Sequence, residues 1–227
     1  MPRLPEIPIL IVALALYVVG LYTALIWAPV ELTLGESYRV FYLHVPAAWV
    51  SYLALGLSLI GSIAYLKTRK TKFDLLAEVT AVLGVLFASL TLVLGSIWAN
   101  VAWGTYWNWD PRETTTLVLW ISYAGYLALR TSIENVGKRA VIPAIYNIFA
   151  FSTVPLSYIS VVYWQTLHPR IIDTSQGLKL SITPEMVTTL MVNLLAATLL
   201  FIYLVNVLYK LRRSERILEE YEELTWR

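Results

Sequence analysis

Six long stretches of the chain are almost free of charged side chains, and short polar segments separate them. A helix needs about 20 mostly apolar residues to cross a bilayer. The fourth stretch is the shortest, with 16 uncharged residues between Thr114 and Leu129. The pattern predicts an all-α membrane protein, a bundle of six transmembrane helices at 7–28, 45–66, 75–98, 114–130, 139–163 and 184–209.

The composition agrees with this pattern. Of the 227 residues, 58% are hydrophobic and only 14% are charged, and the mean hydropathy is +0.65. A soluble protein of this size needs more charge to cover its surface, so a soluble enzyme, a disordered chain and a nucleic-acid binder are excluded. The sequence has no cysteine, which excludes disulfides, thiolate metal sites and iron–sulfur clusters.

The positive charges are divided unequally between the two sides of the predicted bundle. Of the 17 Lys and Arg residues, 13 fall on the side that holds both termini, and the remaining four are Arg39, Arg112, Arg170 and Lys179. Cytoplasmic loops retain an excess of these residues. We therefore predict that both termini are cytoplasmic and that residues 29–44, 99–113 and 164–183 form outer loops.

The sequence changes character after the sixth span. Basic and acidic side chains alternate from Lys210 onward, which is typical of a solvated helix with charge pairs one turn apart. We therefore divide the chain into a six-span membrane domain, 1–209, and a cytoplasmic charged helical tail, 210–227.

Several polar and small residues inside the spans have predictable structural roles. Pro155 should kink the fifth span, and Ser152 or Thr153 could compensate for the freed carbonyl. Asn147 and Asn193 are expected to form hydrogen bonds between helices. Four glycines could pack spans together or against partner proteins, and periodicity does not choose between the two: Gly56, Gly61, Gly84 and Gly95.

Both histidines of the chain, His44 and His168, fall on the predicted outer side. The outer loop between them contains Trp103, Trp107 and Trp109. Each residue has an ordinary explanation, because histidines near a membrane surface are commonly solvated and tryptophans commonly form a belt at the headgroups. The tryptophans are nevertheless strongly biased to the outer side, which suggests that they cover a flat apolar ligand.

The residues after Trp109 also form a helix-start pattern. Asp110 is a suitable N-cap, Pro111 suits the first helical position, and Glu113 suits the third. This pattern alone accounts for Asp110 and Glu113 at the start of the fourth span.

Haem complements this set of outer residues. Its iron accepts axial histidines, its ring favours aromatic walls, and its propionates favour arginines such as Arg112 or Arg39. Gly104 would allow the backbone to approach such a ligand closely. His44 precedes Val45–Pro46, a predicted helix start whose positive end would favour neutral imidazole. Zinc is the competing metal, but it would need a third protein ligand.

The sequence also resembles a known family. The run Trp103-Gly-Thr-Tyr-Trp107-Asn-Trp109-Asp110-Pro-Arg112 resembles the tryptophan-rich "WWD" motif of haem-handling proteins in cytochrome c maturation. The segments around His44 and His168 resemble the two histidine segments of the CcmC family, and the length, the six spans and the order of the motifs agree along nearly the whole chain. The larger WWD relatives, CcmF and the CcsA/CcsB synthases, have more spans and more histidines.

The resemblance implies roles for these residues and a set of partners. His44 and His168 would be the axial ligands of haem b, the three tryptophans of the motif would hold the macrocycle, and Asp110 and Arg112 would shape the loop. The haem would be presented to the chaperone CcmE, beside the transporter proteins CcmA and CcmB and the small membrane protein CcmD. This chain has Pro111 and Glu113 where the family frequently has Ala and Leu, which strengthens the helix cap.

These observations favour a haem-transfer protein in the cytoplasmic membrane, with its site on the outer face, over an enzyme. Two alternatives stay open. A bis-histidine b-type cytochrome could exchange electrons with a quinone, although both histidines are predicted at or beyond helix ends and none is left for a second haem. A haem permease would need a polar path through the spans, for which the sequence offers little.

Overall fold

The computed structural model describes residues 6–168, 172–173, 179–180 and 182–225. Arg3, Arg170, Arg227 and parts of the predicted outer loop 164–183 lie outside the described residues. Helices dominate the described part: α1 (Glu6–Tyr22), α2 (Phe41–Thr68), α3 (Thr71–Trp103), α4 (Pro111–Ser132), α5 (Val136–Ala150), α6 (Thr153–Tyr163) and α7 (Pro184–Thr225). A π-helical turn, η1 (Thr23–Trp27), continues α1, and a 3-10 turn, η2 (Glu36–Val40), leads into α2.

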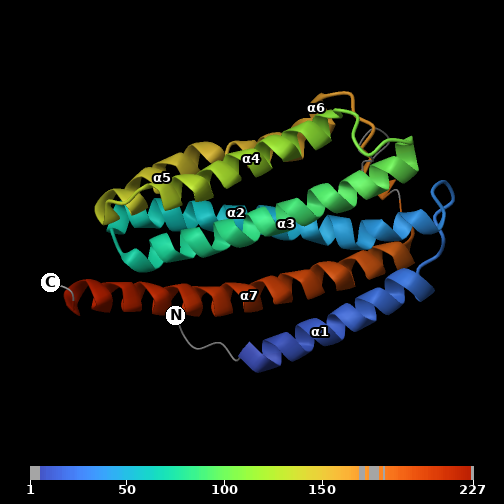
Figure 1. Ribbon diagram of the computed structural model, residues 1–227. Coiled ribbons are helices and arrows are strands. Elements are labelled where there is room, and N and C mark those ends of the chain that lie inside the picture. Colours follow the sequence, from blue (N-terminus) through green and yellow to red (C-terminus); the bar gives the residue numbers. More distant parts are fainter. Residues whose placement is uncertain (1–5, 169–171, 174–178, 181, 226–227) are drawn as a thin grey trace.

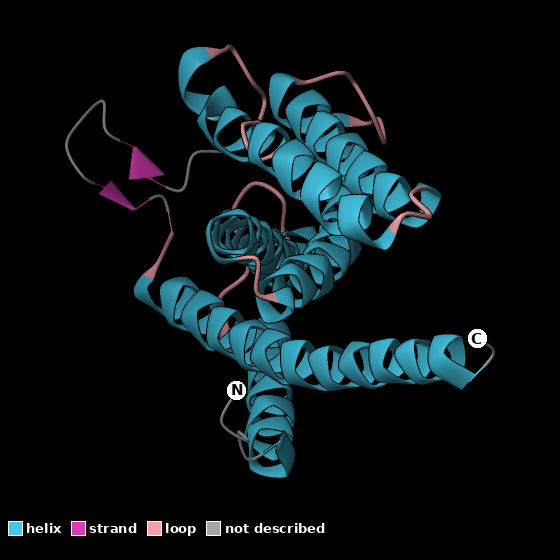
Figure 2. Cartoon of the chain, turned by 90° about the vertical axis from the view of Figure 1, so that its left-hand side faces the viewer, coloured by secondary structure: helices cyan, strands magenta, loops and turns pink. Residues whose placement is uncertain are grey.

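Helices α2 and α3 form the centre of the bundle (Figure 1). Helices α4, α5 and α6 cover one side of this pair, and α7 covers the other side with α1 packed on it (Figures 1 and 2). The segments 104–110 and 164–168 lie at one end of the bundle, which we call the loop end. Both termini lie toward the opposite end, the terminal end.

The predicted all-α membrane bundle is confirmed. Five segments of the described chain are long and apolar enough to cross a membrane: Glu6–Trp27, Glu36–Thr68, Thr71–Trp103, Lys138–Tyr163 and Pro184–Glu219. Helix α4 is more polar, as its short uncharged stretch predicts, and it packs against α3, α5 and α6. The described residues also include a short antiparallel pair of strands, β1 (Ile172–Asp173) and β2 (Lys179–Leu180).

Two helix ends at the loop end differ from the prediction. Helix α2 begins at Phe41, not at Val45–Pro46, because Phe41 and Tyr42 are buried against residues of η1 and α7 and extend the helix past the local proline signal. Helix α3 continues to Trp103, five residues beyond the predicted span. His44 therefore lies inside α2, and Trp98 and Trp103 lie on a helix and not in a loop.

The fifth predicted span is interrupted, as Pro155 suggests. Helix α5 ends at Ala150 and α6 begins at Thr153, two residues before the proline, whose nitrogen has no hydrogen for the Phe151 carbonyl. That carbonyl accepts instead from the Val154 backbone amide at 3.0 Å. The predicted hydroxyls compensate neighbouring carbonyls: Ser152 Oγ donates to the Phe149 carbonyl at 2.7 Å, and Thr153 Oγ1 donates to the Ala150 carbonyl at 2.6 Å.

Small and polar residues bring the central helices close together. A Cβ atom at Gly61 would lie 2.9 Å from the Ala77 nitrogen, so only glycine allows α2 and α3 to approach here. The Ser58 hydroxyl donates to the Ala77 carbonyl at 2.7 Å. The predicted interhelical bonds are also confirmed, because the Asn147 amide donates to Ser58 in α2 and the Asn193 amide donates to the Gly20 carbonyl in α1.

A buried cluster of charges joins three helices near the terminal end. The Arg130 guanidinium of α4 donates to both carboxylate oxygens of Asp74 in α3, at 2.7 and 3.0 Å, and to Glu78 at 3.1 Å. Arg216, from the extension of α7, bonds to the same two carboxylates. Helix α7 runs without a break from Pro184 to Thr225. The Arg216 side chain therefore contacts the bundle from a segment that the sequence suggested was fully solvated.

Replacing one member of this cluster tests its contribution to stability. We expect Asp74→Ala to lower the free energy of unfolding by about 3–5 kcal/mol, because it leaves the buried Arg130 without its main partner. The matched control is Glu215→Ala, which removes the half-exposed pair with Arg212 and should cost less than about 1 kcal/mol. Denaturant unfolding of the full chain in detergent measures both, and equal losses would contradict a special role for the buried cluster.

Candidate functional site

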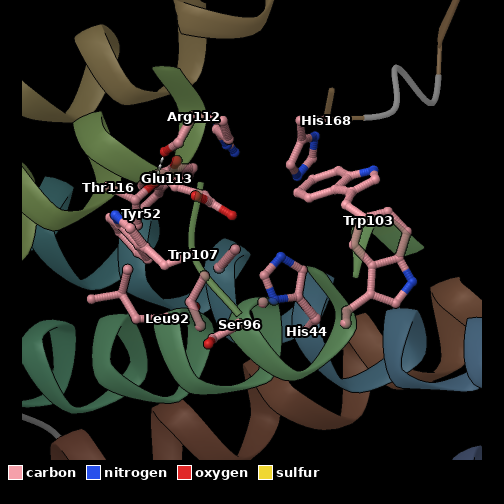
Figure 3. Close-up of a pocket in the computed structure, with 14 residues that line it drawn as sticks. His44, Tyr52, Leu92, Ser96, Trp103, Trp107, Arg112, Glu113, Thr116 and His168 are labelled. Carbon is pink, nitrogen blue, oxygen red and sulfur yellow. Dashed lines mark hydrogen bonds between the residues drawn. The ribbon is translucent and has the colours of Figure 1, made fainter. Parts of the chain in front are cut away.

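A cavity at the loop end brings the two histidines together. His44 from α2 and His168 from the segment after α6 line the same hollow, with His44 below and His168 above it in the view of Figure 3. The space measures about 530 Å³, including the part that is open to solvent. Its walls come from α2, α3, the 104–110 loop, the start of α4 and the segment after α6. Residues 124 positions apart in sequence therefore share one site.

His44 is held against α3 by a glycine. The histidine is the fourth residue of α2, and an ideal Cβ at Gly95 would lie 2.9 Å from His44 Cε1. The absence of a side chain at Gly95 therefore makes room for the imidazole ring. His44 Nδ1 is buried on the side of the ring that faces α3, where the imidazole meets the backbone of Thr91. The ring is therefore held between α2 and α3 at the cavity wall.

His168 lies on the irregular segment that follows the end of α6. Its ring centroid is 6.4 Å from that of Trp98, which lies on the last turns of α3. The backbone amide of His168 donates to the Thr166 hydroxyl at 3.0 Å. Thr166 in turn donates to Asp110, so the residue before α4 contacts the segment that carries the second histidine.

The tryptophans fall into two groups. Trp98 and Trp103 pack edge to face, with ring centroids 5.5 Å apart, and they line the cavity with Trp107. Trp109 is 71% exposed and lies outside this cavity, on a neighbouring apolar groove that shares Trp107 as a wall. Its φ of 64° lies in the left-handed region, a conformation that costs a bulky residue about 1–3 kcal/mol. The Trp109 ring packs edge to face on Trp107, with ring centroids 5.7 Å apart.

Gly104 has a different role from the one the sequence suggested. It ends α3 in the left-handed conformation with φ of 75°, and its amide donates to the Asn100 carbonyl. It does not line the cavity. The glycine therefore reverses the chain at the end of α3 and directs the 104–110 loop back over the site.

Arg112 contributes a positive charge to the cavity wall. Its guanidinium donates to the Ser157 carbonyl of α6 and lies 5.8 Å from the ring centroid of Tyr52 in α2. The Ser157 hydroxyl contacts both Tyr52, at 3.0 Å, and Thr116, at 2.9 Å. Three helices thus fix the position of Arg112.

Arg39, the other arginine proposed for the propionates, does not line the cavity. Its guanidinium bonds to Glu36 in η2 and to the Ala24 carbonyl in η1. Glu113 does line the cavity, and its carboxylate accepts a hydrogen bond from the backbone amide of Asn108 at 3.1 Å. The cavity therefore presents Arg112 and Glu113, one positive and one negative group, from the same turn of α4.

Asp110 caps α4 as predicted, and the structure gives it a second function. Its carboxylate accepts from the Arg112 amide at 2.8 Å, which is the N-cap bond, and also from the Leu167 amide at 2.7 Å. The side chain is 6% exposed and does not line the cavity. Asp110 thus affects the site indirectly, by holding the start of α4 and the segment that carries His168 together.

Sequence reasoning missed four residues that build the site. Gly95 was considered only as a packing residue, and Tyr52, Thr116 and Ser157 gave no signal because polar residues within spans usually bond between helices. Spacing places Tyr52 on the same face of α2 as His44, two turns deeper, and this was the one available clue.

Comparison with known proteins identifies the family that the chain resembles along its length. Residues 4–226 match the family model described as CcmC, heme exporter protein C. The chain is 33% identical to heme exporter protein C of Bradyrhizobium diazoefficiens over 189 residues, which is 83% of this chain and 71% of the relative. It is 34% identical to the protein of the same name from Haemophilus influenzae over 87% of this chain and 80% of that one, and 33% identical to that of Escherichia coli K12 over 74% and 69%.

The contact between Gly95 and His44 generates a direct test of the cavity. Gly95→Ala should keep or slightly raise helix stability, by up to about 1 kcal/mol, but its methyl group must displace the His44 ring. We expect haem affinity, measured by absorbance titration with hemin, to fall ~10–100-fold, as for other residues that orient a metal ligand. Gly56→Ala, which meets nothing within 4 Å, is the matched control and should bind haem normally.

Proposed function

The chain belongs to the heme exporter protein C family, and from this premise we propose that it binds haem b as cargo between His44 and His168 and delivers it to a haem chaperone. Membership makes the protein a haem-handling component of cytochrome c maturation and not a classical enzyme. The observation that carries the finer proposal is that both histidines line one cavity at the loop end (Figure 3).

The chemistry of the cavity fits haem. Two imidazoles are the usual axial pair for a six-coordinate haem iron. His44 lines the cavity with its ring seated against Gly95, so that a ring nitrogen would be available to the iron. Trp98, Trp103 and Trp107 offer aromatic contact to the macrocycle. Arg112 would pair with a propionate, and Glu113 beside it restricts how much negative charge this wall can accept.

Release of the cargo requires that the site be incompletely closed. The cavity is partly open to solvent, and Trp109, outside it, has most of its surface exposed. A chaperone could dock at this opening and take the haem from its uncovered edge. We assign this role to CcmE, with CcmA, CcmB and CcmD as the other members of the assembly.

The orientation follows from the charges and the fold together. The loop end carries few Lys and Arg residues, whereas the terminal end carries most of them, together with both termini. By the positive-inside rule, the terminal end faces the cytoplasm. The haem site then lies on the outer, periplasmic face of the cytoplasmic membrane.

Replacing either histidine tests the proposal. Wild-type protein loaded with haem should show the low-spin absorbance spectrum of bis-imidazole ligation, and His44→Ala and His168→Ala should each lose it because one axial ligand is gone. Added imidazole should restore a six-coordinate spectrum in both variants. Gln165→Ala, an exposed change three residues before His168, is the control and should keep the wild-type spectrum.

Unchanged haem content and spectrum in either histidine variant would rule out the ligand assignment. A transfer assay separates the function from its main alternative. Haem-loaded protein mixed with apo-CcmE should lose haem to the chaperone, whereas a b-type cytochrome should retain it and react rapidly with a quinol.

A further inference from the structure

A single buried carboxylate joins the His168 segment to the start of α4. Asp110 Oδ2 accepts from the Leu167 amide at 2.7 Å, and the Thr166 hydroxyl lies 2.7 and 2.8 Å from the two carboxylate oxygens. The same carboxylate caps α4 through the Arg112 amide. The position of Asp110 is itself fixed, because its own amide donates to Asn108 Oδ1 at 2.9 Å.

Thr166 occupies the central place in this set of bonds. A threonine hydroxyl has one hydrogen to donate and two lone pairs to accept. Thr166 donates to the Asp110 carboxylate and accepts from the His168 amide at 3.0 Å. The carboxylate, the hydroxyl and the backbone of His168 therefore form one continuous hydrogen-bonded chain, and bonds to an ionised acceptor are the stronger kind.

The segment that carries His168 has no regular secondary structure, so these hydrogen bonds largely determine its position. Residues 164–168 belong to neither a helix nor a strand, so no regular backbone ladder holds them. The two contacts with Asp110 connect this segment to a residue 56 positions away that immediately precedes α4. Since α4 also carries Arg112 into the cavity, Asp110 fixes the second histidine relative to the charged wall.

We propose that Thr166 is a positioning residue for haem binding, which, through its hydroxyl bond to Asp110, holds His168 in register with His44 across the cavity. The proposal rests on the function proposed above, since it concerns the geometry of the same two ligands. A substitution at Thr166 separates the two functions of Asp110, because loss of the Thr166 hydroxyl leaves the bond that caps α4 intact.

The test uses the full chain in detergent with hemin as the probe. Thr166→Val removes the hydroxyl with little change in shape. We expect its hemin affinity to fall ~10–100-fold, as for other residues that orient a metal ligand, and its spectrum to shift toward single-imidazole ligation. Millimolar imidazole should restore the six-coordinate spectrum, because the displaced ligand is His168. Thr166→Ser keeps the hydroxyl and should behave as wild type.

A matched control and a haem-free measurement complete the test. Thr115→Val removes a hydroxyl that bonds within α4, to the Pro111 carbonyl at 2.6 Å, and should leave hemin binding unchanged. In the absence of haem, hydrogen exchange at the Leu167 amide should be faster in Thr166→Val than in Thr115→Val, because the bond to Asp110 is weakened.

Each alternative outcome is decisive. A wild-type spectrum and affinity in Thr166→Val, while His168→Ala loses the bis-imidazole spectrum, would overturn the positioning role and leave the proposed function standing. Loss of binding in Thr166→Val without rescue by imidazole would also overturn it, because the site would then have collapsed. If His168→Ala itself changes nothing, it is the ligand assignment that fails.

Discussion

Helices α2 and α3 approach each other so closely that a Cβ at Gly61 would lie 2.9 Å from a backbone nitrogen, and the site takes its geometry from this contact. Near the terminal end, the contact relies on glycine and on hydroxyls that bond to carbonyls of the opposite helix. Toward the loop end, the same pair brings the His44 ring against Gly95 and beside Trp98 and Trp103. One wall of the cavity is therefore a continuation of the close packing of α2 on α3, which gives the first histidine a rigid support.

Helix α4 depends on polar contacts more than the other spans do. Its hydropathy is low, yet it lies within the bundle because each end is fixed by buried charged groups. At the loop end, the Asp110 carboxylate accepts from the Arg112 amide in the first turn of α4 and from the Leu167 amide beside His168. At the terminal end, Arg130 is paired with Asp74 and Glu78. A buried charge with all its partners in place is tolerated, whereas one that has lost a partner is costly, so these two clusters restrict where the helix can sit.

Much of the architecture could be predicted from the sequence, because spans are set by hydropathy and the break in the fifth span is set by the chemistry of proline. The helix cap at Asp110 is equally local and was predicted correctly. Local signals failed where tertiary contacts decide. Burial of Phe41 starts α2 before its proline, and Arg39 bonds to the Ala24 carbonyl of η1 while Arg112 faces the cavity. The contact between Asp110 and Thr166 joins residues 56 positions apart, which no local pattern encodes.

The interruption between α5 and α6 has a mechanical consequence. Helix α5 is anchored to α2, where the Asn147 amide bonds to two serine hydroxyls. Helix α6 packs on α4, and Ser157 contacts both Thr116 and Arg112 there. Helix α5 touches α4 as well, through the Tyr146 hydroxyl that donates to the Ser122 carbonyl. The segment that hydropathy counts as one membrane crossing therefore has two halves with different attachments, and only the half nearer the histidines is tied by hydrogen bonds to the turn that carries Arg112.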